Sequence, residues 1–187
     1  ETVAHPFKDV NPARDLKSLI ESIVYSDYEQ VDKRLARLVK EGKKKSREYA
    51  LLQKINARLE QEELLGPDFL LPEDLKLFSG FSFLSVKPLI VLANIGEASP
   101  DLKPLIDVAA KSGLDLFKLN AKAEMEIAQL PDDEQKEFLA DMDLKEPVKV
   151  RFLKQLYSSL NLISFLTTGE DEVRAWSIPA GSTAQKA

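Results

Sequence analysis

An apolar stripe with helical spacing constrains the fold of this chain more than any other sequence feature. From Pro12 to Lys40, apolar residues recur at steps of three and four with charged residues between them. This pattern predicts one long amphipathic helix, with Asn11 as its N-cap and Pro12 at the first helical position. The apolar positions are Leu16, Leu19, Ile20, Ile23, Val24, Val31, Leu35 and Leu38.

The stripe resumes after a polar break that contains Gly42 and three lysines. Leu52, Ile55 and Leu59 continue the spacing until Gly66-Pro67, which is a helix stop signal. Two helices joined by a short polar turn predict an antiparallel helical hairpin of the coiled-coil type, inserted over residues 12–67.

After a short helix from Pro72 to Phe78, the chain takes on the pattern of an α/β fold. Lys87–Asn94 is an almost unbroken apolar run, typical of a parallel strand buried on both faces. A helix over Pro100–Ser112 and a strand over Leu114–Leu119 follow, and this order predicts a right-handed parallel unit. The predicted class is therefore a helix-rich α/β fold with part of a parallel-sheet domain.

The remaining pattern is helical and then changes to strands near the end of the chain. Leu162–Thr167 and Val173–Ile178 flank a turn and predict the first hairpin of a separate small domain, with Trp176 in its core. We expect this small domain to be incomplete within residues 161–187. The helices expected before this hairpin cover Ala123–Gln129, Asp132–Ala140 and Val148–Leu160.

Composition narrows the classes of function. The 26 basic and 31 acidic residues leave a net charge of -5, which gives no general attraction to DNA or anionic lipid. The absence of cysteine and the single histidine leave too few ligands for a thiolate or histidine metal site. No apolar run is long enough for a membrane helix, and no signal peptide begins the chain. We expect a cytoplasmic protein whose start is a cut inside a larger protein.

Two loops follow the predicted strands, where ligands of open α/β sheets bind. The first contains Asn94, Ile95, Gly96 and Glu97. An Asn followed three residues later by an acid resembles the Asn-Lys-x-Asp motif with which P-loop GTPases select the guanine base. In that motif the carboxylate accepts hydrogen bonds from the base edge, and the Asn fixes the loop and the purine N7.

Departures from this motif indicate adenine. Glu97 stands where the motif has Asp, so the carboxylate that would read guanine is shifted. Ile95 replaces the lysine of the motif and can pack on the face of the base. The second loop, Asn120-Ala121-Lys122, resembles the Ser-Ala-Lys motif, whose backbone amide at the Ala meets the purine edge. These residues are therefore predicted to bind ATP, with GTP less favoured.

An Asn-x-x-Glu loop combined with a helical insertion resembles the YchF-like, or Obg-like, family of P-loop ATPases. The resemblance covers almost the whole chain. It implies that residues 1–11 and 68–160 are the carboxyl-side part of a nucleotide-binding domain and that 161–187 begin a TGS domain. The other similar segments are Val10–Asp15, Asp27–Leu35, Val86–Pro88, Ala121–Leu130 and Phe165–Ile178.

The resemblance also implies an activity for the larger protein, namely ATP hydrolysis coupled to ribosomes or translation. His5 lies seven residues before Pro12, the family position of a histidine proposed to replace the water-orienting glutamine of related GTPases. An imidazole is chemically able to orient or activate water. Magnesium is expected only in the larger protein.

Two motifs needed for hydrolysis do not occur. No two of the seven glycines are five residues apart, so there is no Walker A loop, and no Asp precedes a Gly by three residues. The phosphate-binding residues must lie before Glu1 or have been lost, so this chain alone is predicted to be inactive.

Simpler interpretations stay open for each of these residues. The loop after Asn94 can be a plain strand-to-helix turn, Asn120 a helix cap and His5 an exposed side chain. In a second hypothesis, the basic turn at 43–45, together with Arg47, lets the hairpin serve as a non-enzymatic module that docks a protein or RNA.

Overall fold

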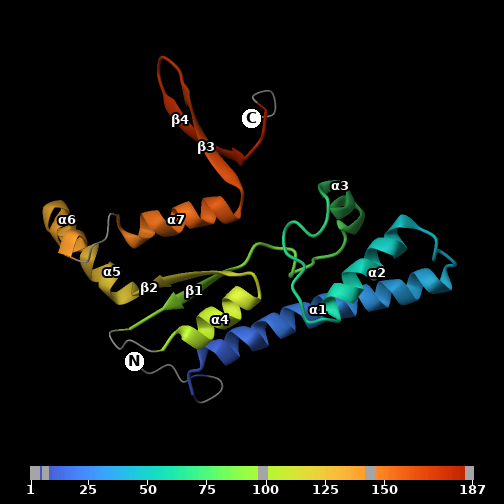
Figure 1. The fold of residues 1–187 in the computed structure, drawn as a ribbon. Coiled ribbons are helices and arrows are strands. Elements are labelled where there is room, and N and C mark those ends of the chain that lie inside the picture. Colours follow the sequence, from blue (N-terminus) through green and yellow to red (C-terminus); the bar gives the residue numbers. More distant parts are fainter. Residues whose placement is uncertain (1–4, 6–8, 97–100, 142–145, 184–187) are drawn as a thin grey trace. The chain divides into compact units, whose positions relative to one another are not determined.

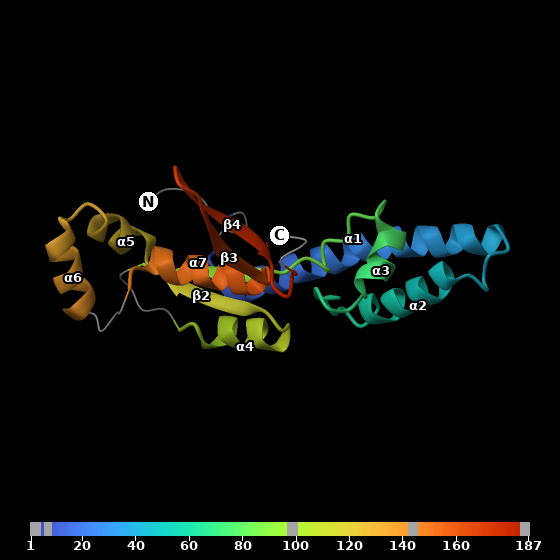
Figure 2. The same ribbon diagram turned by 90° about the horizontal axis from the view of Figure 1, so that it is seen from above.

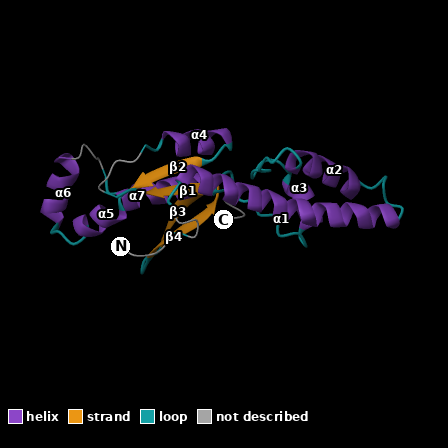
Figure 3. Ribbon diagram, turned by 90° about the horizontal axis from the view of Figure 1, so that it is seen from below, coloured by secondary structure: helices purple, strands orange, loops and turns teal. Residues whose placement is uncertain are grey.

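The computed structural model describes residue 5 and residues 9–96, 101–141 and 146–183. Within these, the chain divides into two compact units, residues 1–88 with 101–115 and residues 89–100 with 116–187. Helices make up most of the regular structure (Figure 3), and the predicted helix-rich α/β class is confirmed. No helix among the described residues combines the length and hydropathy needed to cross a membrane.

The first unit is built on an antiparallel helical hairpin, as predicted. Helix α1 covers Pro12–Lys40, and the side chain of Asn11 caps it by accepting from the Arg14 amide at 3.1 Å. Helix α2 covers Arg47–Leu59. The two helices lie side by side and run in opposite directions (Figures 1 and 2).

Most of the predicted apolar stripe is buried, but Leu19 is 57% exposed, and Ile23 and Leu35 are half-buried. An ion pair also joins the two helices, because Arg34 of α1 donates two hydrogen bonds to Glu48 of α2, at 2.6 and 2.9 Å. The buried apolar residues of the two helices are Leu16, Ile20, Val24, Val31, Leu38, Leu52, Ile55 and Leu59.

Helix α2 ends at Leu59 and not at Gly66. Glu62 adopts a left-handed conformation with φ 58, which no α-helix continues through. Beyond it, Leu65 is buried and the Gly66 amide donates to the Ser85 carbonyl at 2.8 Å. Leu65 and Gly66 therefore belong to the packed loop after the helix.

The buried carboxylate of Asp27 fixes a distant loop to α1. Its two oxygens accept from the backbone amides of Leu84 and Ser85 at 3.0 and 2.8 Å, and from the Ser85 hydroxyl at 2.6 Å. This loop follows helix α3, Pro72–Leu75, and a 3-10 helix, Lys76–Phe78, as predicted. Together these contacts anchor the chain on the hairpin before it enters the sheet.

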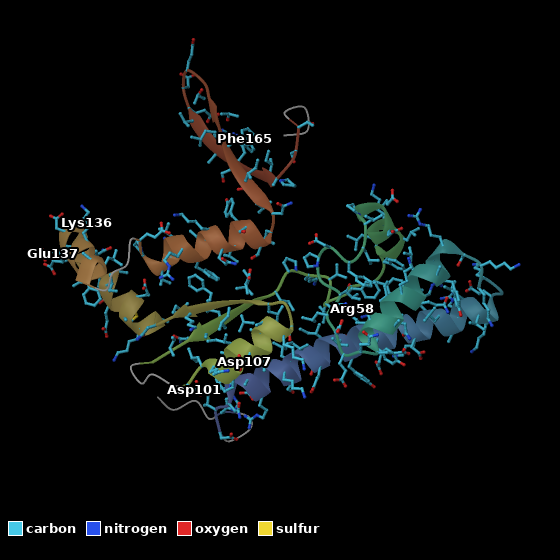
Figure 4. The ribbon with its side chains drawn as sticks, viewed as in Figure 1. Arg58, Asp101, Asp107, Lys136, Glu137 and Phe165 are labelled. Atoms are coloured by element: carbon cyan, nitrogen blue, oxygen red, sulfur yellow. The ribbon has the colours of Figure 1, made fainter. Side chains whose placement is uncertain are left out.

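Helix α4, Lys103–Lys111, completes the first unit and packs against α1. The Asp101 carboxylate accepts from the Lys103 amide at 2.9 Å, and Asp107 pairs with the Lys103 ammonium at 2.9 Å. Figure 4 labels Asp107 on this helix and Asp101 just before it. The predicted helix over 100–112 is thus present with slightly shorter bounds.

The second unit contains the parallel strand pair β1, Ile90–Asn94, and β2, Asp115–Leu119 (Figure 1). The predicted burial of the first strand on both faces is wrong. Its residues are half-buried or exposed, and Leu92 is 47% exposed, because this sheet has only two strands among the described residues.

Three helices and a second strand pair complete the second unit. The helices are α5, Ala121–Ile127, α6, Asp132–Asp141, and α7, Val148–Ser159. Strands β3, Leu162–Thr168, and β4, Val173–Pro179, form the predicted antiparallel hairpin.

Trp176 is not a core residue, contrary to expectation. It pairs across the hairpin with Phe165, which Figure 4 marks on β3, and its indole donates to Thr167 Oγ1 at 2.9 Å. It remains 46% exposed because no described element covers this face of the two-stranded sheet.

Candidate functional site

The loops after β1 and β2 meet at the carboxyl edge of the parallel strand pair. The Ile95 amide donates to the Leu119 carbonyl at 2.8 Å, which extends the pairing one residue beyond β1. Both strands therefore release their loops at the same edge, where ligands of open α/β sheets bind.

A side-chain hydrogen bond joins the two loops directly. Asn94 Oδ1 accepts from the backbone amide of Ala121 at 3.1 Å, and Asn94 is exposed. Because the carbonyl oxygen faces the second loop, the two hydrogens on Asn94 Nδ2 are directed elsewhere. This orientation leaves an amide donor for an acceptor such as a purine N7.

Asn120 is the N-cap of α5. Its Oδ1 accepts from the Ala123 amide at 3.1 Å, and its backbone is extended, with φ -112. The side-chain oxygen is therefore engaged by the helix, as the simpler interpretation of this loop expected. Lys122 is exposed in the first turn of the same helix.

Ala121 has a more constrained position than the sequence indicated. Its backbone amide, expected to meet the purine edge, already donates to Asn94. A contact with a base would require this amide to be shared or exchanged. Ile95 is half-buried, and Glu97 lies outside the described residues.

His5 belongs to a separate polar cluster in the first unit. Its Nε2 lies 3.0 Å from Asp15 Oδ2, and both side chains are 25% exposed. Arg14 donates to the other Asp15 oxygen at 2.9 Å and also contacts Asp9 at 3.0 Å. The hydrogen bond from Arg14 lowers the pKa of the Asp9 carboxyl. An imidazole held by a carboxylate in this way has one nitrogen fixed.

Sequence reasoning missed Asp15 as a partner of His5 and Asp27 as a buried anchor. Asp27 lies three residues after Val24 and four before Val31, in the middle of the apolar stripe. An acid on a buried helix face is a detectable signal for a satisfied internal carboxylate. Asp15 gave no comparable signal, because an acid in the first turn of a helix is ordinary.

The basic turn of the hairpin is partly neutralised by acids. Lys43 contacts Glu41 at 2.8 Å, and Arg47 contacts Asp74 at 2.6 Å and Glu73 at 3.0 Å. Two of the four cations that suggested an RNA-binding tip are thus paired. The pairs weaken the sequence argument for a purely interactive module.

A parallel strand pair with polar loops at its carboxyl edge, together with a helical hairpin, defines the class as a P-loop GTPase-like α/β fold with a helical insertion. Solved structures agree. The Schizosaccharomyces pombe YchF GTPase superposes with a TM-score of 0.80 at 25% identity, over 98% of this chain and 53% of that one.

Sequence comparison finds similar proteins that share one name. Proteins named ribosome-binding ATPase YchF are 32% identical in Pasteurella multocida and in Escherichia coli O157:H7, over 100% of this chain. The Bacillus subtilis protein of the same name is 29% identical over 98% of the chain. No protein-family model matches the chain.

This chain is homologous to the YchF proteins along its whole length. It spans about half the length of the curated relatives it matches, 53% of the Pasteurella multocida protein and 54% of the Escherichia coli one.

Proposed function

We propose that this chain supplies the base-recognition loops of a YchF-type ATPase that acts in the cytoplasm on ribosomes or the translation machinery. The observation that carries the proposal is the Asn94–Ala121 hydrogen bond, which ties together the two loops expected to hold a purine. The names of the relatives support the ribosomal partner, since each is called a ribosome-binding ATPase.

The proposed domain organisation follows the resemblance. Residues 1–11 and 68–160 form the carboxyl-side part of the nucleotide-binding domain, 12–67 form the inserted hairpin, and 161–187 begin a TGS domain. The antiparallel strand pair β3–β4 is compatible with the last assignment.

Base recognition would depend on Asn94. Its Nδ2 donates to the purine N7 while its Oδ1 keeps the second loop in place. Ile95 packs its half-buried side chain on the base, Glu97 accepts from the adenine amino group, and Ala121 and Lys122 close the other side. This arrangement favours ATP over GTP.

Phosphate binding and hydrolysis would need residues outside these loops. The chain has no Walker A loop, and no cluster of three acidic or histidine side chains among the described residues could hold a metal. We expect magnesium to be held with the phosphates by other parts of the whole protein. His5 would orient the attacking water, with its ring fixed by Asp15.

The substitution Asn94→Asp tests base recognition. An aspartate still accepts from the Ala121 amide, but it loses the Nδ2 donor to N7. We expect the chain to bind ATP with a dissociation constant on the order of 1 mM, since the phosphate contacts that dominate affinity are absent. In Asn94→Asp, the ATP-dependent NMR shifts of residues 120–122 should disappear.

Asn11→Asp is the matched control, because it makes the same chemical change at a helix cap that an aspartate also fills. It should leave ATP binding unchanged. Equal ATP binding by wild type and Asn94→Asp would rule out the role of Asn94. Submicromolar ATP binding by this chain would rule out the assignment of phosphate contacts to other segments.

A further inference from the structure

A groove of about 610 Å³ lies on the first unit, between the first half of α1 and the end of α2. Its lining includes apolar and aromatic side chains, among them Leu59, Tyr25 and Tyr28. Tyr25 is 63% exposed, so its ring is accessible to a ligand. None of the residues assigned to base recognition lines this groove.

The lining of this groove also contains acidic residues. Glu21 of α1, and Glu60 and Glu62 of the turn after α2, line it, and none of its described lining residues is Lys, Arg or His. Glu62 has the left-handed φ of 58 that terminates the helix, so the turn that ends α2 brings this carboxylate to the groove. The carboxyl end of α2 adds a negative partial charge.

The carboxylates are weakly neutralised by the chain itself. Lys17 approaches Glu21 only to 3.5 Å, and Glu60 accepts from the neutral amide of Asn56 at 2.7 Å. Among the described residues Arg58 pairs with the neighbouring Glu63 at 2.8 Å, and not with Glu62. Such a surface repels phosphate, so a nucleic acid is a poor occupant.

A basic peptide matches both properties of the groove. The stems of lysine and arginine are apolar and can pack on Leu59 and the tyrosine rings, while their charged ends reach the carboxylates. A cation above a tyrosine face gains further attraction. The Tyr25 side chain is held in one orientation by a hydrogen bond, because its hydroxyl donates to Glu29 at 3.3 Å.

We propose that this groove docks a basic, amphipathic peptide segment of a partner protein. Charge complementarity selects the partner, and Leu59 with the two tyrosine rings supplies the apolar contact. The surface differs in sign from the lysine-rich turn at the far end of the hairpin, so the hairpin would present a protein-binding groove near one end and a partly neutralised basic turn at the other.

The test uses the full chain and an amphipathic leucine–lysine peptide of about 18 residues, long enough to form a helix. Binding is measured by calorimetry and mapped by NMR. We expect shifts to concentrate at Tyr25, Tyr28 and Leu59. The double variant Glu60→Gln/Glu62→Gln should weaken binding about tenfold, and Tyr25→Ser should weaken it as well.

The matched control is Glu137→Gln/Glu170→Gln, which removes the same charge at exposed sites in the second unit; Figure 4 marks Glu137 on α6. The control should bind the peptide as wild type does. Equal loss in both double variants would mean non-specific attraction to an acidic chain and would overturn the proposal. Shifts centred outside the groove, or tighter binding of a single-stranded RNA at the same residues, would also overturn it.

Discussion

Two polar side chains hold loops that the backbone alone does not fix. Asn94 joins the loops after the parallel strands with one hydrogen bond, and Asp27 holds the loop at Leu84 and Ser85 with three. The first is exposed and the second fully buried. An exposed amide can exchange its partner for a ligand at little cost, whereas a buried carboxylate cannot lose its partners without a large penalty.

Asp27→Ala should therefore destabilise the chain strongly. The substitution leaves two backbone amides and the Ser85 hydroxyl without an acceptor in a dry environment. We expect a loss of about 3 kcal/mol in the free energy of unfolding, measured with urea. Asp32→Ala, at an exposed position of the same helix, should change it by less than about 0.5 kcal/mol. Similar losses of unfolding free energy in the two variants would show that the Asp27 contacts do not stabilise the fold.

The carboxyl of Glu41 should titrate below its ordinary pKa of 4.5, because hydrogen bonds from Lys43, and then from Arg37, stabilise its charged form. A lowered pKa means that these pairs persist above pH 4.5 and are lost as the pH falls through the lowered value. An NMR titration of Glu41 measures this. Lys43→Met should raise the midpoint and Lys44→Met should not; equal midpoints in all three proteins would contradict the pairing.

At the scale of elements, the helical hairpin depends on its apolar stripe and on one ion pair between its helices. The Arg34–Glu48 pair is bidentate and only about a quarter exposed, with side-chain exposures of 27% and 24%. Low exposure and fixed geometry make such a pair stronger than an ordinary surface pair.

A double-mutant cycle with Arg34→Ala and Glu48→Ala measures this pair. We expect a coupling of about 1 kcal/mol. The exposed pair of Lys33 with Glu29 provides the comparison, for which about 0.4 kcal/mol is typical. If Arg34 and Glu48 couple no more strongly than Lys33 and Glu29, the pair does not help to hold the helices together.

Element positions were predictable where local chemistry decides them. Asn11 and Pro12 mark the start of α1, and the turn after Thr168 separates β3 from β4. The end of α2 was not predictable, because the left-handed conformation that ends it falls on Glu62, a residue type that gives no helix stop signal. The exposure of Leu92 was missed for a related reason, since an apolar run does not reveal how many strands flank it.

At the scale of the whole molecule, the sequence predicted that the loops at Asn94 and Ala121 lie together, because parallel strands end at one edge. It did not predict that the Ala121 amide would be occupied by Asn94. That contact depends on a side-chain rotamer, which motif spacing does not encode. The homology to YchF proteins supports the nucleotide proposal without identifying the residues that contact the base.

The central claim is that the loops after β1 and β2 form a purine site, and amide NMR of the whole chain titrated with ATP tests it most directly. We predict that the largest shifts fall on Asn94, Ile95 and Ala121, with weaker effects from GTP at the same concentration. Shifts confined to other parts of the chain, or none at concentrations well above 1 mM, would contradict the claim.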